Sequence, residues 1–188
     1  MCFRLLILVF FCILPNSALA QAVSYVFWTD KSSGKIQRSD LNGSNVVDLV
    51  LGLNQPVDIA VDATNEKIYW TEEAGLIKRA NLDGSSIETI KSGLSNRTFI
   101  ALDVASGYLF WSLEKDPGEL RRSNLDGSDE QTIVSGDNAK SKYPKFIALD
   151  SESNVYYRSN VPPNSDYVIR RVNGNPGSSV STIITGHF

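Results

Sequence analysis

Three aspartates, each at the end of an apolar run, are the residues of this sequence best placed for acid–base or metal chemistry. They are Asp62, Asp103 and Asp150, which end the runs "VDIAVD", "FIALD" and "FIALD". Carboxylates that converge in a fold can exchange protons with a substrate or hold calcium. Because these three recur at one position of a repeated pattern, we favour a structural role for them. We expect no catalytic, cofactor-binding or metal-binding residues.

Composition argues against cysteine and histidine chemistry. Both cysteines, Cys2 and Cys12, lie near the N-terminus, and the single histidine, His187, is next to the last residue. The chain between them therefore lacks thiolate ligands and cysteine nucleophiles. A histidine cluster for catalysis, or for ligand release triggered by acid, is not expected either.

Residues 1–20 have the pattern of a secretory signal peptide. Arg4 precedes an apolar run from Leu5 to Leu14, and the small residues of Ala18–Ala20 form a cleavage site. Cleavage leaves residues 21–188, with 17 basic and 21 acidic side chains. This remainder has no second long apolar run and only a mild charge. We therefore predict a secreted, extracellular chain that neither inserts into a membrane nor binds nucleic acid.

One sequence pattern occurs four times along the chain. Its aromatic anchors are "FWTD", "YWTE", "FWSL" and "YYRS", whose second residues are 28, 70, 111 and 157, in steps of 42, 41 and 46. A basic strand-like run and a turn follow each anchor, as in "LIKRANLDGS" at residues 76–85. A regular period of this length indicates a repeat architecture. The units are residues 25–51, 56–92, 98–135 and 145–185.

Each unit is predicted to form short strands, four in a complete copy. In the second unit these are residues 57–61, 67–71, 76–81 and 87–91, which are rich in Ile, Val, Tyr, Trp and Thr. In "KIYWT" both faces carry large apolar side chains, which is typical of a sheet buried on both sides. The prediction is an all-β protein, a β-propeller of four-stranded antiparallel blades, rather than a sandwich.

The anchor, the basic strand and the Asn-Leu-Asp-Gly turn together resemble the YWTD repeat, also called the low-density lipoprotein receptor class B repeat. The resemblance implies a six-bladed β-propeller of the kind found in lipoprotein receptors, Wnt co-receptors and nidogen, where it is a protein-binding platform. It also implies a structural role, within and between blades, for the residues at the motif positions. These are Phe27, Trp28, Thr29, Asp30, Tyr69, Trp70, Thr71, Glu72, Phe110, Trp111, Ser112, Tyr156 and Tyr157 in the anchors, Arg38, Arg79, Arg122 and Arg171 at the basic position, and Asp83, Gly84, Asp126 and Gly127 in the turns.

The third and fourth units depart from the motif. Leu113 stands where an acidic residue is expected, and Tyr157, Arg158 and Ser159 replace the tryptophan, threonine and acidic residue of the fourth anchor. The fourth unit also contains "VPPNSD" at residues 161–166 and "NGNPG" at residues 173–177. The first of these insertions fits either a plain surface loop, which we favour, or a binding loop.

Four units are fewer than the six that the resemblance implies. The first unit begins near Tyr25 with its second strand, and the last ends at Phe188, at a junction between repeats. We therefore expect an open or incomplete ring and a fragment of a larger receptor or matrix protein. The alternatives are a tight four-bladed ring and self-association through open blade faces.

The function predicted from these features is a non-catalytic extracellular module that binds a protein, whose identity and binding residues the sequence does not reveal. Two sequons, at Asn42 and Asn96, fit a secreted glycoprotein. One alternative is a propeller enzyme of hydrolase or lactonase type, which would use the three aspartates. Another is a structural matrix protein resembling nidogen, which requires a longer parent chain.

Overall fold

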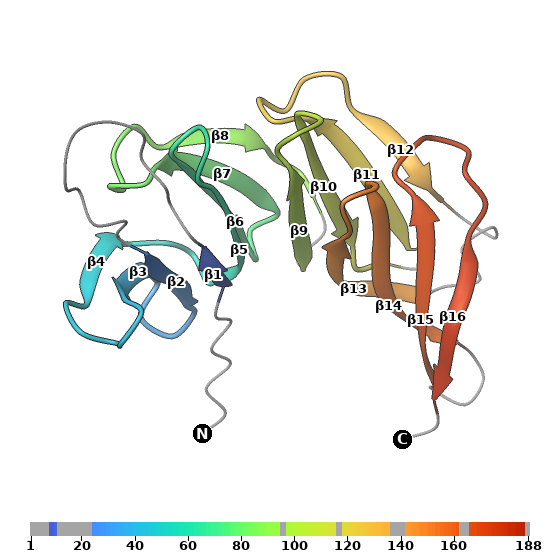
Figure 1. The fold of residues 1–188 in the computed structure, drawn as a ribbon, viewed down its shortest axis with the longest axis horizontal. Coiled ribbons are helices and arrows are strands. Elements are labelled where there is room, and N and C mark those ends of the chain that lie inside the picture. The colour runs from blue at the N-terminus through green and yellow to red at the C-terminus, as the bar shows by residue number, and fades with distance from the viewer. Residues whose placement is uncertain are drawn as a thin grey trace.

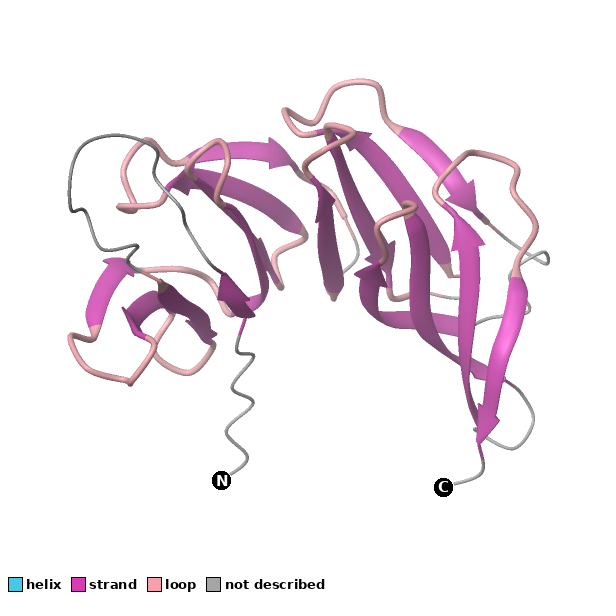
Figure 2. Cartoon of the chain, viewed as in Figure 1, coloured by secondary structure: helices cyan, strands magenta, loops and turns pink. Residues whose placement is uncertain are grey.

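The computed structural model describes residues 8–10, 24–94, 97–115, 118–135, 142–161 and 166–186. Over these residues the chain forms strands and loops and no helix (Figure 1, Figure 2). The strands form four sheets of four, and within each sheet they follow one another in chain order. Neighbouring strands are antiparallel. The predicted all-β fold of four-stranded antiparallel blades is therefore confirmed.

The four sheets are called blades 1 to 4. Blade 1 contains β1 (Leu8–Phe10), β2 (Tyr25–Asp30), β3 (Lys35–Asp40) and β4 (Val47–Val50). Blade 2 contains β5 (Pro56–Asp62), β6 (Lys67–Glu72), β7 (Leu76–Asn81) and β8 (Glu88–Lys91). Blade 3 contains β9 (Thr98–Asp103), β10 (Tyr108–Leu113), β11 (Glu119–Asn124) and β12 (Gln131–Val134). Blade 4 contains β13 (Lys142–Leu149), β14 (Asn154–Val161), β15 (Asp166–Asn173) and β16 (Ser181–Gly186).

The anchor strand of blade 2 shows why the repeat folds in this way. β6 pairs with β7 in register from Lys67 opposite Asn81 to Glu72 opposite Leu76. Because side chains alternate along a strand, Ile68 and Trp70 point to one face of the sheet and Tyr69 to the other. Ile68, Tyr69 and Trp70 are each at most 1% exposed, so both faces of the blade are buried.

The core lies between the blades rather than inside any one of them. Three apolar clusters join blade 1 to blade 2, blade 2 to blade 3, and blade 3 to blade 4. The aromatic residue that precedes each anchor tryptophan or its equivalent faces the next blade, and the anchor residue itself faces the preceding one. The aromatic members are, in that order, Phe27 with Trp70, Tyr69 with Trp111, and Phe110 with Tyr157.

The first strand of blade 1 differs from the sequence prediction. The sequence predicts no such strand, whereas Leu8–Phe10 form β1 and pair with Tyr25–Phe27 of β2. An open strand edge carries unpaired backbone groups that an extended segment can satisfy, and sequence similarity between repeats does not register this. β1 lies inside the predicted signal peptide, so cleavage after Ala20 would remove it and leave blade 1 with its other three strands. The rest of the predicted signal peptide lies outside the described residues, so secretion stays a prediction.

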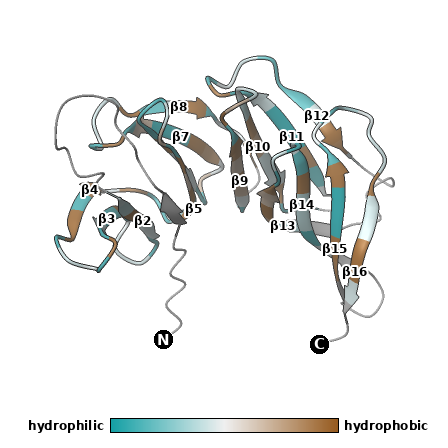
Figure 3. Ribbon diagram, in the orientation of Figure 1, coloured by the Kyte–Doolittle hydropathy of each residue, from teal (hydrophilic) through white to brown (hydrophobic). Residues whose placement is uncertain are grey.

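The blades stand side by side in an arc, with blade 1 at one end and blade 4 at the other (Figure 1). Along the inside of this arc β9, the first strand of blade 3, contacts both β5 of blade 2 and β13 of blade 4. At the end formed by blade 4, Ile169, Ile183 and Ile184 are exposed, and Figure 3 shows the apolar stretch along β16. In the part of the chain that the structure describes, no helix has the length and apolar character of a membrane span.

Candidate functional site

The aromatic anchor residues are placed between blades, where a ligand cannot reach them. Tyr69, Trp70, Phe110, Trp111 and Tyr157 are each at most 1% exposed. The two anchor aromatics at the ends of the arc differ: Trp28 and Tyr156 are half-buried. Trp28 donates from Nε1 to Oε1 of Gln37 at 3.0 Å, and Tyr156 donates to Asp150 at 3.0 Å.

The small hydroxyl residue after the anchor aromatics is buried and lies at an interface between blades. Thr71 donates from Oγ1 to the carbonyl oxygen of Thr98, on the first strand of blade 3, at 2.8 Å. Thr29 and Ser112, at the same position in blades 1 and 3, are also buried. Thr71 thus joins two blades, whereas the hydroxyl of Ser112 is buried with no hydrogen-bond partner among the described residues. All three side chains are buried, so none of them is an exposed nucleophile.

The acidic anchor position serves a different purpose in each blade. Asp30 caps a turn by accepting hydrogen bonds from the backbone N–H groups of Ser32 and Ser33. Glu72 is only 2% exposed and accepts hydrogen bonds from Nε1 of Trp70 at 3.1 Å and from the N–H of Asn54 at 3.0 Å. Nζ of Lys78 also forms an ion pair with Oε1 of Glu72 at 2.9 Å.

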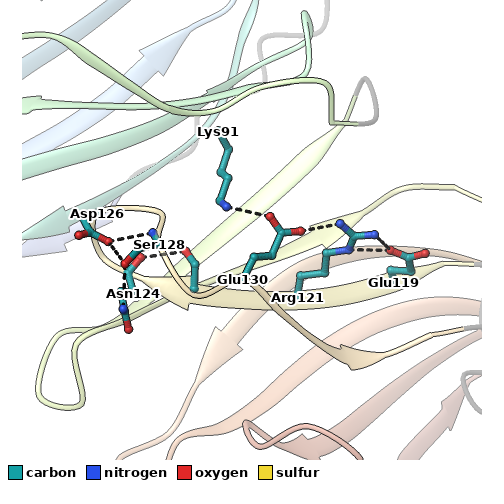
Figure 4. Close-up of polar contacts among 8 residues, drawn as sticks. Lys91, Glu119, Arg121, Asn124, Asp126, Ser128 and Glu130 are labelled. Atoms are coloured by element: carbon teal, nitrogen blue, oxygen red, sulfur yellow. Dashed lines mark hydrogen bonds and ion pairs between the residues drawn. The ribbon is translucent and has the colours of Figure 1, made fainter.

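Leu113 replaces that glutamate in blade 3, so the neighbouring tryptophan loses the carboxylate that accepts its hydrogen bond in blade 2. Nε1 of Trp111 is buried and has no hydrogen-bond partner among the described residues. The ammonium group of Lys91, from blade 2, lies 5.6 Å from the Trp111 ring centroid and pairs with Glu130 at 2.8 Å. Figure 4 shows how this pair continues through Arg121, so that a chain of alternating charges crosses from blade 2 to blade 3.

The arginines at the basic position join each blade to the next. Arg79 donates from Nε and Nη2 to Glu88 within its own blade and from Nη1 to the carbonyl oxygen of Leu125 in blade 3 at 3.2 Å. Arg122 repeats this arrangement, with Nη1 2.9 Å from the carbonyl oxygen of Gly174 in blade 4.

The two outer arginines of the set depart from this arrangement. Arg38 stacks over Tyr25, 4.2 Å from the ring centroid. In blade 4, Ser181 lies opposite Arg171, where Glu88 and Gln131 lie opposite Arg79 and Arg122. Serine is too short to reach the guanidinium group, and the buried Nε of Arg171 has no hydrogen-bond partner among the described residues.

The Asp-Gly turns are closed by their own side chains. Asp83 and Asp126 each accept hydrogen bonds from the hydroxyl and the N–H of the serine two residues later, as Figure 4 shows for Asp126 and Ser128. These bonds from Ser85 and Ser128 hold the pKa of both carboxyl groups below the usual range. Gly127 follows Asp126 as Gly84 follows Asp83, with φ of 85° and 84°.

The three aspartates best placed for chemistry are engaged in turns. Asp62 accepts a hydrogen bond from the N–H of Asn65, and Asp103 accepts from the N–H of Ser106 and from the hydroxyl of Ser153 in blade 4. Hydrogen bonds from Asn154 lower the pKa of Asp150 to about 2, so this group stays ionised near neutral pH. In the described ranges no group of three or more His, Cys, Asp or Glu side chains could hold a metal ion.

One end of the arc collects charged residues that the repeat motif does not include. This "anchor end" is where the second strand of each blade ends, at residues 31–34, 73–75 and 114–115. Glu73 of blade 2 pairs with Lys31 of blade 1 and lies 3.7 Å from Nε of Arg97, which precedes blade 3. Glu114 of blade 3 pairs with Lys145 of blade 4 at 2.7 Å. The anchor end is thus crossed by ion pairs between blades.

The residue before the "IA" pair of each first strand differs among blades, and it also lies near the anchor end. It is Asp58 in blade 2, Phe99 in blade 3 and Phe146 in blade 4. Asp58 is buried and accepts hydrogen bonds from the N–H groups of Ile59 and Ile100 at 2.9 Å. Its burial raises the pKa of its carboxyl group to about 6.

Phe146 is the exposed member of that set. Its side chain is 42% exposed, and its φ of 52° is left-handed, which bulky residues rarely adopt. The pairing register shifts between Lys145 and Ile147, so a bulge turns Phe146 away from the ladder. Its ring lies against that of Phe99, with the centroids 4.9 Å apart and the planes tilted by 42°, and the guanidinium carbon of Arg158 lies 6.0 Å from its centroid. Phe146 was not among the predicted site residues, although its difference from Asp58 at the same repeat position was a usable signal.

The two sequons can be located only in part. Asn42 is exposed, and its Oδ1 accepts hydrogen bonds from the N–H and the hydroxyl of Ser44 at 2.9 and 2.6 Å. Asn96 lies outside the described residues. Glycosylation of either one stays a prediction.

Comparisons with known proteins agree with the propeller architecture. Residues 24–63 match the family model of the low-density lipoprotein receptor repeat class B. The fold is similar to a chain of the nidogen/laminin complex, with a TM-score of 0.72 and 22% identity over 83% of this chain and 59% of that one. It is also similar to catalytically inactive virginiamycin B lyase from Staphylococcus aureus with quinupristin, with a TM-score of 0.68 and 20% identity over 92% and 59% of the two chains.

The match to hydrazine synthase of Kuenenia stuttgartiensis has a TM-score of 0.63 and 12% identity over 85% of this chain and 46% of that one. No curated protein matches the sequence. Aligned lengths show that the chain spans less than two thirds of these solved chains. Proteins with different activities thus share this scaffold, so the likeness establishes the fold and leaves function to the residues.

Proposed function

From a low-density lipoprotein receptor class B repeat at residues 24–63 and a propeller fold like that of nidogen, we propose that this chain is an extracellular, non-catalytic module that binds another protein. The family match supports a protein-binding role. The chain spans 59% of the similar nidogen chain, so the partner is proposed rather than transferred from that protein. The partner we propose is an extracellular protein.

We place the binding site at Phe146, because its aromatic ring is exposed. Protein interfaces are enriched in aromatic residues and arginine, and a few such residues dominate the binding energy. At the anchor end Phe146 combines an exposed ring, a strained backbone and a neighbouring arginine, Arg158. Strain of this kind persists where the surrounding structure holds it and often accompanies function. The nearby ion pair of Glu114 with Lys145 restrains the flanking strand.

The contacts of the three aspartates support a non-catalytic role. A general acid or base needs a pKa near the working pH, whereas the pKa of Asp150 is about 2 and the pKa of Asp103 is lowered by its serine partners against the effect of burial. The likeness to virginiamycin B lyase is a likeness of fold at 20% identity. The aspartates are better explained as caps of the turns that join first and second strands.

Two features of the sequence support an extracellular location. Residues 1–20 have the signal peptide pattern, and Asn42 offers an exposed sequon. A matrix role resembling that of nidogen is the second candidate. It is favoured by the fold similarity and requires that one molecule hold two partners at once.

The experiment that tests this function compares the secreted chain with a Phe146→Asn variant. Asparagine tolerates the left-handed backbone and removes the ring. Laminin is the first probe, because the similar nidogen structure contains it, and proteins of conditioned medium are the second. We expect the variant to weaken binding of the captured protein at least about tenfold. Ile87→Asn, at a residue 51% exposed, is the control and should bind normally.

Two results would argue against the proposal. If the wild-type chain retains no protein from either source, the binding function is wrong. If it retains a protein that the Phe146→Asn variant binds equally well, the module binds elsewhere. A matrix scaffold would additionally hold two different partners in one complex, which a two-colour sandwich assay detects.

A further inference from the structure

The ion pairs at the anchor end are arranged with the basic side chain outermost. They are Lys31–Glu73, Arg97–Glu73, Lys115–Glu119 and Lys145–Glu114. In each of these pairs the basic side chain is the more exposed member. Arg97 is 48% exposed against 25% for Glu73, and Lys145 is 24% exposed against 13% for Glu114. A molecule that approaches this end therefore meets ammonium and guanidinium groups before it meets carboxylates.

The order is reversed where the acidic member lies on the fourth strand of a blade or in the turn before it. These pairs are Lys35–Asp48, Arg79–Glu88, Lys91–Glu130 and Arg121–Glu130. Here the acidic side chain is the more exposed member, as with Glu88 at 50% against 21% for Arg79. The whole chain has 18 basic and 21 acidic side chains. The basic surface of the anchor end thus follows from the placement of the charges and not from an excess of basic residues.

Blade 4 places two of its basic side chains beside the exposed ring of Phe146. Lys145 stands directly opposite Arg158 on the neighbouring strand, and the guanidinium carbon of Arg158 lies 6.0 Å from the centroid of the Phe146 ring. In blade 3 the position of Lys145 is occupied by Thr98, which stands opposite the uncharged Leu113. Like charges that face each other across two strands repel, so a negative group that arrives between Lys145 and Arg158 is attracted by both.

We propose that the partner bound at the anchor end is an acidic segment of an extracellular protein, in which a carboxylate side chain lies next to an apolar one. The apolar side chain packs on Phe146, and the carboxylate pairs with Lys145 and Arg158. This partner class rests on the binding function proposed above. The basic surface also speeds the encounter with such a segment through long-range attraction. A sulfated polysaccharide fits less well, because its evenly repeated charges would also meet Glu73 and Glu114.

A library of random peptides displayed on phage tests the chemistry of the partner. The library is panned against the immobilised secreted chain, and the retained peptides are sequenced. We expect them to carry Asp or Glu within a few residues of a large apolar side chain. Peptides that bind at this site should no longer be retained by the Phe146→Asn variant, which lacks the ring.

Removal of single charges locates the contact. We expect Lys145→Gln and Arg158→Gln each to weaken binding of a selected acidic peptide at least about fivefold at low salt. The loss should shrink as salt is added, because salt screens exposed charges. Lys67→Gln is the matched control, because it removes the same charge at the opposite end of β6, where Lys67 donates to Asn81. It should bind normally, and circular dichroism establishes that each variant is folded.

Three results would overturn the acidic partner. The first is a selection that yields no peptides or peptides without enrichment of acidic residues. The second is a selected peptide whose binding neither charge removal weakens. The third is retention on heparin that Lys145→Gln abolishes while no acidic peptide is selected, which would assign the surface to a sulfated polysaccharide.

The binding function itself is judged with laminin and the proteins of conditioned medium. A protein that the Phe146→Asn variant loses, but that Lys145→Gln and Arg158→Gln both bind as the wild type does, would leave the binding function standing and overturn the acidic partner. A wild-type chain that retains no protein from either source contradicts the binding function, and the acidic partner falls with it.

Discussion

Glu72 and Leu113 occupy the same anchor position in neighbouring blades, and they leave their tryptophans in different states. Glu72 accepts a hydrogen bond from Trp70, whereas the indole N–H of Trp111 has no partner among the described residues. A buried donor without an acceptor is unfavourable by about 1–3 kcal/mol. At the scale of single residues, blade 2 is therefore better satisfied than blade 3 at this site.

Replacing Glu72 should destabilise the fold through the partners that it leaves behind. Glu72→Leu removes the hydrogen-bond acceptor for Trp70 and Asn54, and it leaves the ammonium group of Lys78 without this ion-pair partner. We expect the free energy of unfolding to fall by about 3 kcal/mol, measured by urea denaturation. Glu72→Gln keeps an oxygen acceptor and should lose roughly half as much. Equal losses in the two variants would contradict this explanation.

Asp58 makes stability depend on pH in a definite direction. Burial raises its pKa to about 6 from an ordinary value of 3.8, so the folded state holds the proton more tightly than the unfolded state. Its stabilising contribution is present in full below the unfolded pKa and is lost as pH rises through about 6. Asp58→Asn cannot titrate.

The difference in unfolding free energy between Asp58→Asn and the wild type should therefore shift in favour of the variant as the pH rises. The expected shift is on the order of 3 kcal/mol between about pH 4 and about pH 7. Urea denaturation at a series of pH values measures it. A difference that stays constant with pH would show that Asp58 does not hold its proton in the folded state.

At the scale of elements, the Asp-Gly turns also determine how closely blades approach. A Cβ atom on Gly84 would lie 2.2 Å from the carbonyl oxygen of Leu49, on the last strand of blade 1. Gly43 occupies the same place in the turn of blade 1, with φ of 81°, and a Cβ atom there would meet nothing within 4 Å. The two glycines share a backbone conformation and differ in whether a blade is packed against them.

Alanine at these two glycines separates backbone strain from packing between blades. Gly43→Ala should cost about 1 kcal/mol, the strain of a left-handed alanine. Gly84→Ala carries the same strain and must also push blade 2 away from blade 1, for a total of about 3 kcal/mol. Thermal unfolding of dilute samples measures both. Equal losses would mean that the blades adjust to the added methyl group freely.

The elements themselves were largely predictable from sequence because the information for them is local. In the second unit, strand-forming runs and turn residues predict all four strands within one residue of their observed ends. β1 was not predictable, because Leu8–Phe10 lie within the predicted signal peptide and resemble no other first strand. Phe146 was missed for a related reason: a repeat motif draws attention to what recurs, and Phe146 is exposed through a bulge in one copy only.

At the scale of the whole molecule, stability should vary along the arc. Within the described residues, blades 2 and 3 are packed on both faces, whereas blades 1 and 4 each pack on one other blade. In a repeat array stability is approximately a sum over blades and the interfaces between them. The two end blades therefore have one stabilising interface fewer than the inner ones.

Hydrogen exchange of the backbone amides should follow this gradient. We expect the amides of blades 2 and 3 to exchange at least about tenfold more slowly than those of β3 and β4 in blade 1 and of β15 and β16 in blade 4. Mass spectrometry of peptic fragments resolves the blades. Uniform protection along the chain would mean that the arc unfolds as one unit, without opening first at its ends.

The placement of the three tryptophans gives the molecule its own optical reporters. Trp70 and Trp111 are completely buried, so their fluorescence should be insensitive to dissolved quenchers until the arc unfolds. Trp28, half-buried at the end of blade 1, should be the accessible emitter of the native chain. Quenching of its emission would therefore report on the state of blade 1 in the folded chain without any attached label.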